Sequence, residues 1–283
     1  MTDTTDRVRA HYDFPGLVDR IKTALAPIVP EEQPLTVFQL AMLDQFHTRG
    51  ILATAELAGA AGLTTGDTVL DVGCGIGGPA RYLASKFGCR VTGIDLSPSF
   101  VEAAEYLTVR CGLGDRVTFK VGNALHLPFD DGAFDSVFLQ HVAMNIADRA
   151  ALYGEIHRVL KLRGRLATYD LVLKDGDVVY PAPWARNDST SFLLSADDTR
   201  AALQAAGFTA TLWRDDTRTA FDWYKASAAN PPPAGLSLGV VMGAEFPAIT
   251  GNLGRNIREG RLGVLSAVLT RNRTTYSHDR GRA

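Results

Sequence analysis

The feature that constrains this chain most is the segment from Val69 to Ala84, VLDVGCGIGGPARYLA. A β-branched and aliphatic run over residues 68–72 ends in a cluster of glycines, and an apolar pattern of helical period follows from Pro79. This order predicts a strand, a tight turn and a helix. Because glycines have no Cβ, a ligand can lie directly on the turn, where the start of the helix presents unpaired N–H groups. We therefore expect the turn to bind a flat or anionic ligand.

Two cofactor classes use a turn of this kind. Gly73, Gly75 and Gly78 satisfy the dinucleotide pattern G-x-G-x-x-G, which indicates NAD. However, Asp71 before the packed turn GCGIGG, together with Asp95 in VTGIDLS, resembles motifs I and post-I of class I S-adenosylmethionine (SAM) methyltransferases. The form GIGGPAR resembles the branch that includes sterol, tocopherol, phosphoethanolamine and sarcosine/dimethylglycine methyltransferases. The resemblance implies SAM as the cofactor, with NAD as the alternative.

The resemblance also implies an α/β fold, in which a Rossmann-like methyltransferase sheet of seven strands carries helices on both faces. Residues 1–62 have a helical pattern interrupted by prolines, and we expect them to form an N-terminal helical lid. Residues 63–175 are the expected SAM-binding core. Residues 176–283 are expected to supply substrate-cap elements inserted around the core and the end of the sheet.

Composition narrows the choice of partners. The chain has 283 residues, a formal net charge of -2 and no lysine and arginine cluster interleaved with aromatics, so nucleic acid is not expected. Three cysteines without C-x-x-C spacing predict neither a disulfide framework nor a zinc site. Without an apolar leader or a run of about 18 apolar residues, neither a signal peptide nor a membrane span is expected. We predict a cytoplasmic protein with a small-molecule substrate and leave homo-oligomerisation open.

The resemblance places cofactor contacts at the ends of the expected strands. Asp95 ends the second strand, where an acid can reach both ribose hydroxyls. Asn123 stands where the family usually has Asp, and its carbonyl oxygen can still accept a hydrogen bond from the adenine amino group. The alternative is that Asn123 caps a turn. The expected cofactor set in the core is Asp71, Gly73, Cys74, Gly75, Asp95, Leu96, Asn123, Ala124 and Gln140.

A second group of cofactor contacts is expected in residues 44–50, DQFHTRG. In the phosphoethanolamine and dimethylglycine enzymes, a segment of aromatic and polar residues at this place covers the methionine end of SAM. The resemblance therefore implies that Phe46 faces the sulfonium through a cation–π contact and that His47 or Thr48 binds the carboxylate. The alternative is an N-terminal helix that packs its apolar side on the sheet.

The expected catalytic residue is His141. It follows the fourth predicted strand, in the region of the sheet where cofactor and substrate are expected to meet, and a neutral imidazole can accept a proton near pH 7. In phosphoethanolamine methyltransferases a histidine lies at the matching place. A purely structural histidine is the alternative.

Substrate contacts are expected from aromatic side chains late in the chain. Residues 172–195 form a long stretch with no clear periodicity, and loops of this length inside a compact domain are usually functional or disordered. Aromatic residues argue against disorder. The expected substrate-binding residues are Tyr180, Trp184, Trp213 and Trp223.

Three functions remain open on this reading. N- or O-methylation of a small polar metabolite or natural product fits the DQFH segment. C-methylation of an isoprenoid such as a prenyl diphosphate or sterol fits GIGGPAR, since aromatics would stabilise the carbocation and His141 would take the proton. A regulatory SAM-binding module is the non-enzyme alternative. No metal is expected, because Asp170 with Asn187 or Asp188 has no diagnostic spacing.

Overall fold

The computed structural model describes residues 4–229 and 236–272. Seven strands form one sheet in the order β3-β2-β1-β4-β5-β7-β6. The first five strands in this order pair in parallel, and β7 runs antiparallel to both of its neighbours. The strands are β1 (Thr68–Val72), β2 (Arg90–Asp95), β3 (Val117–Val121), β4 (Phe134–Gln140), β5 (Leu160–Leu173), β6 (Phe208–Asp215) and β7 (Leu262–Arg271). The seven-stranded methyltransferase sheet expected from the sequence is confirmed.

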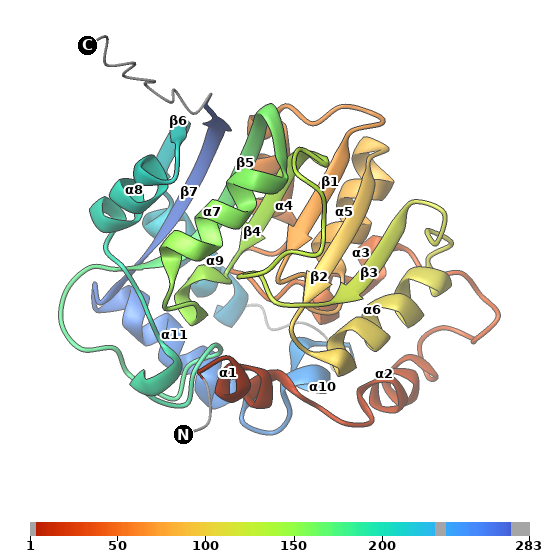
Figure 1. Ribbon diagram of the computed structural model, residues 1–283. Helices are drawn as coiled ribbons and strands as arrows, with labels where there is room; N and C mark the ends of the chain where they lie inside the picture. The colour runs from red at the N-terminus through yellow and green to blue at the C-terminus, as the bar shows by residue number, and fades with distance from the viewer. Residues whose placement is uncertain (1–3, 230–235, 273–283) are drawn as a thin grey trace, which may run out of the picture.

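Helices cover both faces of the sheet, as Figure 1 shows. One face packs against α4, α5 and α6, and the other packs against α7 and α8. The helices are α1 (Thr4–Tyr12), α2 (Leu17–Leu25), α3 (Val37–Asp44), α4 (Ile51–Ala61), α5 (Gly78–Phe87), α6 (Pro98–Arg110), α7 (Arg149–Val159), α8 (Ala196–Ala205), α9 (Thr217–Ala229), α10 (Leu238–Met242) and α11 (Phe246–Arg258), with short 3-10 helices η1 (Ala143–Asn145) and η2 (Asp188–Thr190).

The central strands β1 and β4 are mostly apolar because helices cover both of their faces. In β1 the residues from Val69 to Val72 are all buried, and β4 is almost wholly buried. The chain leaves β1 in one direction toward β2 and β3, and returns to the other side of β1 for β4 and β5. This reversal leaves a crevice at the carboxyl ends of β1 and β4, where ligands bind in open sheets of this type.

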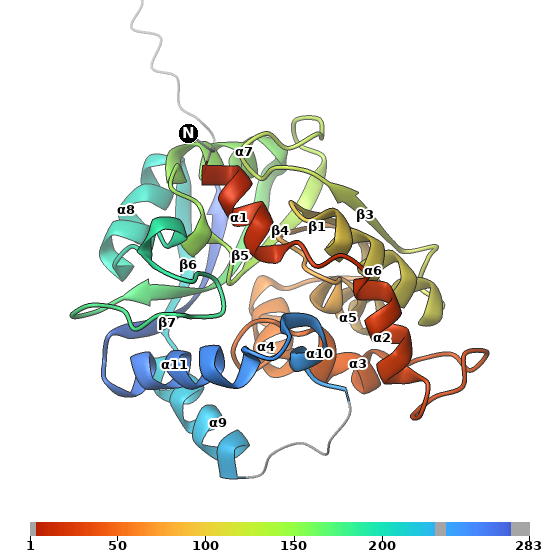
Figure 2. The ribbon, with the colours of Figure 1, turned by 90° about the horizontal axis from the view of Figure 1, so that it is seen from below.

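The N-terminal helices divide into two groups. The apolar face of α4, including Leu57 and Ala58, lies in the helical layer on the sheet. In contrast, α2 and α3 share a separate core with α6, α10 and Ile76 of the glycine turn. Figure 2 shows α2 and α3 near α10, with α1 on the same side of the molecule. The lid therefore remains a prediction for α1 to α3, whereas α4 belongs to the sheet layer.

Candidate functional site

A cavity of about 940 Å³ lies at the carboxyl ends of β1, β2 and β4. Its volume is near the upper end of the range for small-molecule sites, which leaves room for SAM beside a second molecule. The glycine turn, the ends of β2 and β4 and residues 45–52 form one side, and α1, α9, α10 and α11 form the other. Thirteen expected site residues line it: Phe46, His47, Thr48, Gly73, Gly75, Asp95, Leu96, Asn123, Ala124, Gln140, His141, Trp184 and Trp223.

The glycine turn has a backbone that residues with a Cβ rarely adopt. Gly73 and Gly75 have φ angles of 68° and 53°. A Cβ on Gly73 would lie 2.4 Å from Val142 Cγ2, so this position has no space for a side chain. A Cβ on Gly75 would lie 3.5 Å from the Phe46 ring. Phe46 therefore lies over the turn and lines the cavity.

Asp95 anchors the turn to the end of β2. Its Oδ2 accepts a hydrogen bond from the Gly75 amide at 2.9 Å, and its Oδ1 accepts one from the Ser97 amide at 2.9 Å. Burial raises the pKa of Asp95, while the bonds from these amides favour the charged form. Each carboxylate oxygen keeps lone-pair capacity, so the group can hold the turn and accept further donors from a ligand.

Asp71 and Cys74 lie behind the turn and do not line the cavity. Asp71 is 2% exposed, and burial, together with the charge of Asp95, raises its pKa to about 7. Its Oδ2 has no hydrogen-bond partner among the described residues. The Cys74 thiol is also buried, which raises its pKa. Both were expected to contact the cofactor; in the structure both are buried and neither is among the residues that line the cavity.

Asn123 lines the cavity beside Ala124, and its side chain also caps a turn. Its Oδ1 accepts a hydrogen bond from the Leu125 amide at 2.9 Å. Asn123 therefore caps a turn, as the alternative expectation stated, through this one hydrogen bond. A carbonyl oxygen has two lone pairs, so this bond leaves one for another donor.

His47 and Thr48 are committed to internal hydrogen bonds. His47 Nε2 lies 2.9 Å from the Gly50 carbonyl oxygen and 3.0 Å from Gln140 Nε2. Burial lowers the pKa of His47 to about 4, so its ring is neutral near pH 7. The Thr48 hydroxyl donates to the Tyr169 hydroxyl at 3.0 Å. These contacts fasten residues 47–50 to the ends of β4 and β5.

His141 is one of the residues that line the cavity. It follows β4 directly with a φ of 54°, and its amide donates to the Tyr169 carbonyl oxygen at 2.8 Å. Its ring stacks on the Tyr169 ring, with the centroids 5.6 Å apart and the planes 1° from parallel. Burial and the neighbouring His47 hold the pKa of His141 well below its usual value. Its buried Nε2 has no hydrogen-bond partner among the described residues.

Sequence reasoning missed a polar cluster at the far side of the cavity. The Tyr12 hydroxyl donates to Asn145 Oδ1 at 2.9 Å, and Asn145 Nδ2 donates to the carbonyl oxygens of Trp184 and Thr190 at 2.8 and 2.9 Å. Nearby, Asp170 accepts from the Ala143 amide at 2.8 Å and fixes the turn after β4. Tyr12 and Asn145 are 133 residues apart, and no local pattern in the sequence joins them.

The four aromatics expected at the substrate do not all lie there. Trp184 and Trp223 line the cavity, and the indole N–H of Trp184 donates to Ser191 Oγ at 2.8 Å. Tyr180 lies behind Trp184, in edge contact with its ring at 6.4 Å between centroids, and is not part of the lining.

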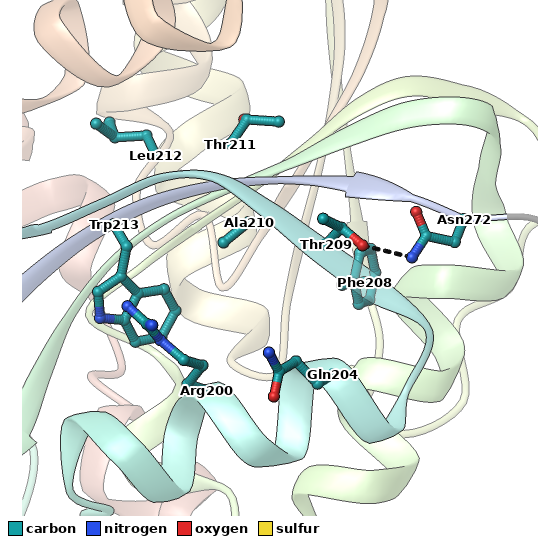
Figure 3. A pocket seen from close by; sticks show the side chains of 9 residues that line it. All are labelled: Arg200, Gln204, Phe208, Thr209, Ala210, Thr211, Leu212, Trp213 and Asn272. Atoms are coloured by element: carbon teal, nitrogen blue, oxygen red, sulfur yellow. Dashed lines mark hydrogen bonds between the residues drawn. The ribbon is translucent and has the colours of Figure 1, made fainter.

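Trp213 is far from the cavity, contrary to the sequence expectation. It lies on β6, which β5 and β7 separate from β4. There it lines a second hollow of about 600 Å³ between α8 and β6, shown in Figure 3, and the Arg200 guanidinium lies 4.5 Å from the centre of its ring. Aromatic character alone could not tell which edge of the sheet this side chain would reach.

The cavity lining carries little positive charge. Arg49 is the only lysine or arginine among its described residues, and both of its terminal nitrogens bond to Glu56, at 3.1 and 2.5 Å. The remaining lining is mostly apolar. Within residues 4–229 and 236–272, no group of three or more His, Cys, Asp and Glu residues could hold a metal ion. No helix in this part of the chain is long and apolar enough to cross a membrane.

Comparison with known proteins gives matches to the same core. Residues 70–168 match the model of a methyltransferase domain family. A sterol 24-C-methyltransferase of Eremothecium gossypii is 40% identical over 119 residues, which are 42% of this chain and 32% of that protein. A chloroplastic protein of Oryza sativa subsp. japonica, described as a probable tocopherol O-methyltransferase, is 46% identical over 92 residues, 32% of this chain and 25% of the relative. The matched segments thus span a third or less of these relatives.

The likeness to solved structures extends over nearly the whole chain. Geranyl diphosphate C-methyltransferase from Streptomyces coelicolor A3(2) superposes with a TM-score of 0.67 at 20% identity, covering 95% of this chain and 98% of that one. This likeness shows the shared fold, including the N-terminal helices. The motifs, the family match and the fold agree: residues 70–168 form a methyltransferase domain, and this core is similar to those of the sterol and tocopherol methyltransferases.

Proposed function

We propose that this protein transfers the methyl group of SAM to a hydroxyl of a neutral, largely apolar small molecule, with His141 as the general base. The observation that carries the proposal is a buried, neutral imidazole that lines a cavity large enough for two ligands and whose Nε2 has no hydrogen-bond partner among the described residues. A neutral imidazole at this place is ready to accept a proton.

The residues of the turn fit the cofactor. Gly73 and Gly75 line the cavity without side chains, and Asp95 offers carboxylate lone pairs beside Gly75. Phe46 lies over Gly75, where an aromatic face would attract a sulfonium. When bound, SAM supplies an activated methyl group, so the protein must mainly place the acceptor and exclude water.

The role of His141 follows from the balance of the reaction. As the acceptor oxygen forms a bond to the methyl carbon, the methyl–sulfur bond breaks and the sulfur keeps its electron pair. The acceptor O–H must then lose a proton, and the imidazole of His141, whose Nε2 has no partner among the described residues, is the base that lines the cavity at this point. Stacking on Tyr169 fixes the plane of the imidazole, so the nitrogen needs little reorientation.

Charge in the lining argues for a neutral acceptor. A prenyl diphosphate would bring several negative charges into a cavity whose only described arginine, Arg49, already pairs with Glu56. Burying such charges without partners is costly. The apolar walls instead fit a hydrophobic molecule, which would bind mainly because its apolar surface is buried. From the sequence, the acceptor considered was a small polar metabolite or natural product; we now propose an apolar natural product.

A second candidate is C-methylation of a neutral isoprenoid such as a sterol. The observation in its favour is the pair of tryptophan rings, Trp184 and Trp223, in the lining, because aromatic faces stabilise a carbocation. The sterol 24-C-methyltransferase that the chain resembles carries out this type of reaction according to its name. In this case His141 would take the proton from carbon.

The test is incubation of the purified protein with methyl-labelled SAM and a panel of phenols, aliphatic alcohols, sterols, amines and prenyl diphosphates. We expect label in neutral hydroxylated acceptors, with the product identified as a methyl ether by mass spectrometry and NMR. Label on carbon would select the second candidate. Label confined to prenyl diphosphates would overturn the argument from charge, and failure to bind SAM would overturn the function itself.

A further inference from the structure

We propose that Arg81 is a positioning residue of the cofactor site, which holds the end of α3 against the glycine turn so that residues 44–46 are already in place when SAM binds. The inference rests on the proposed function, because it assumes that the turn and Phe46 receive SAM. Arg81 lies on α5 and does not line the cavity, so it acts through its neighbours.

Four hydrogen bonds surround the guanidinium of Arg81, which is wholly buried. Its Nη2 donates to Asp44 Oδ2 at 2.9 Å and to the Ile76 carbonyl oxygen at 2.7 Å. Its Nη1 donates to the Ala104 carbonyl oxygen and to Thr108 Oγ1, both at 3.1 Å. One side chain therefore connects the end of α3, the glycine turn and α6.

The end of α3 packs closely against the start of α5. A Cβ on Gly78, the first residue of α5, would lie 2.1 Å from the Asp44 carbonyl oxygen, so this close approach requires glycine. Gln45 follows and donates through Nε2 to Asp44 Oδ1 at 3.3 Å. Phe46 comes next and lies over Gly75. The position of Asp44 thus sets the positions of two cavity-lining side chains.

Gln45 gives a second sign that this segment is arranged for a ligand. It is 5% exposed and lines the cavity, and its Oε1 has no hydrogen-bond partner among the described residues. A buried amide oxygen without a partner is costly, and such atoms are usually found where a ligand or water completes them. Asp44 holds the other end of the same amide.

A buried ion pair is an expensive way to join two helices. Both Arg81 and Asp44 are at most 1% exposed, and apolar residues of similar size often stabilise a fold as well as such a pair does. What the pair provides is a fixed geometry. If it keeps residues 44–46 ordered before SAM arrives, binding does not have to offset the entropy of ordering them. The expected effect of its loss is therefore on cofactor affinity rather than on the chemical step.

The experiment measures binding of S-adenosylhomocysteine by calorimetry in the full-length protein and three variants. Arg81→Met removes the guanidinium, and Asp44→Asn keeps the shape while removing the charge. Arg165→Met is the matched control, because Arg165 also pairs with a carboxylate, Asp67, and binds two carbonyl oxygens, at the opposite end of β1. Melting temperature is recorded for each variant, along with kcat and the two KM values.

We expect the Kd for S-adenosylhomocysteine to rise at least tenfold in Arg81→Met and about threefold or more in Asp44→Asn, with kcat at saturating SAM within about threefold of the original protein. Arg165→Met should lower the melting temperature without changing this Kd. Unchanged affinity in Asp44→Asn overturns the inference, and that variant decides alone if Arg81→Met does not fold. Equal loss of affinity in Arg165→Met also overturns it. If the original protein binds no S-adenosylhomocysteine, the proposed function fails instead.

Discussion

The two halves of the cavity are built in different ways. In the half formed by the strand ends, backbone and carboxylate groups are fixed by short hydrogen bonds, such as those from the Gly75 and Ser97 amides to Asp95. In the half formed by α9, α10 and α11, the lining consists mainly of apolar side chains, including Trp223 and Leu253. The first half can bind a ligand through directional hydrogen bonds, whereas the second can bind one by burying its apolar surface.

This difference indicates how the molecule separates binding of the cofactor from binding of the acceptor. Directional hydrogen bonds discriminate strongly, because a missing partner leaves a buried polar group unsatisfied. Apolar walls discriminate weakly, by about 1 to 3 kcal/mol for each methylene. The strand-end half is therefore suited to one invariant cofactor, and the helical half can change its acceptor through a few side chains. His141 stands between the two halves, at the end of β4.

The largest effect of a substitution on turnover is expected at His141, between the two halves. His141→Asn should lower kcat on the order of a hundredfold, because it removes the base that accepts the acceptor proton. Asparagine tolerates the positive φ of this position better than alanine does, so the backbone should be preserved. The measurement is steady-state turnover together with melting temperature and SAM affinity, both of which should change little. A variant that keeps full turnover, or that only unfolds, would make His141 a structural residue.

The next largest effect is expected in the strand-end half. Asp95→Ala removes the carboxylate beside Gly75, and loss of a charged hydrogen-bond partner costs about 1.5 to 3 kcal/mol. SAM affinity measured by calorimetry should therefore fall at least tenfold. The acceptor KM, extrapolated to saturating SAM, should stay within about twofold. If the acceptor KM rises as much as the SAM Kd, the two halves are not separate.

The strand-end half is also the part that could be predicted from the sequence. Residues 68–87 form the expected strand, glycine turn and helix. They could be predicted because the spacing of apolar residues, the glycines of the turn and the start of the helix are all local features of the sequence. The same is true of Asp95, which ends β2. The seven-stranded sheet could be expected once these motifs were identified.

The remainder depends on packing between distant segments. The alanine-rich pattern of α4 predicts a helix, but it does not show that the helix lies on the sheet and not in a lid. Tyr12 meets Asn145 only because α1 crosses the strand ends. Asp71 has the expected place in the motif, yet it is buried and is not among the residues that line the cavity.

A smaller effect is expected in the helical half. Trp223→Ala removes an aromatic face from the acceptor wall, and the half-buried position suggests a loss of about 1 kcal/mol, so the acceptor KM should rise about three- to tenfold. SAM affinity should not change. Trp223→Phe is the matched control and should recover most of the loss. A rise in the SAM Kd in place of the acceptor KM would assign this wall to the cofactor.

The pH dependence of the His141 step should be shallow near neutrality. Burial lowers the pKa of His141, so the neutral form persists as the pH falls below 6.5 and is lost only when the pH passes through the lowered pKa. An unperturbed histidine would already be about half protonated at pH 6.5. We therefore expect the ratio of kcat/KM between the original protein and His141→Asn to change by less than about twofold from pH 8 to 6.5. A midpoint near 6.5 in this ratio would contradict the buried environment.

The smallest effect is expected at Trp213, which lies outside both halves. Its ring packs between β6 and α8 beside Arg200 (Figure 3). In the sheet, β5 and β7 lie between β6 and β4, the strand that His141 follows. Trp213→Ala should lower stability by about 1 kcal/mol through loss of ring contacts and the cation–π interaction. The kcat, the acceptor KM and the SAM Kd should each stay within about twofold. Denaturant unfolding and steady-state kinetics on one preparation check both parts. If Trp213→Ala raises the acceptor KM as much as Trp223→Ala does, the acceptor reaches the second hollow, and the wall that contains Trp223 is not its boundary.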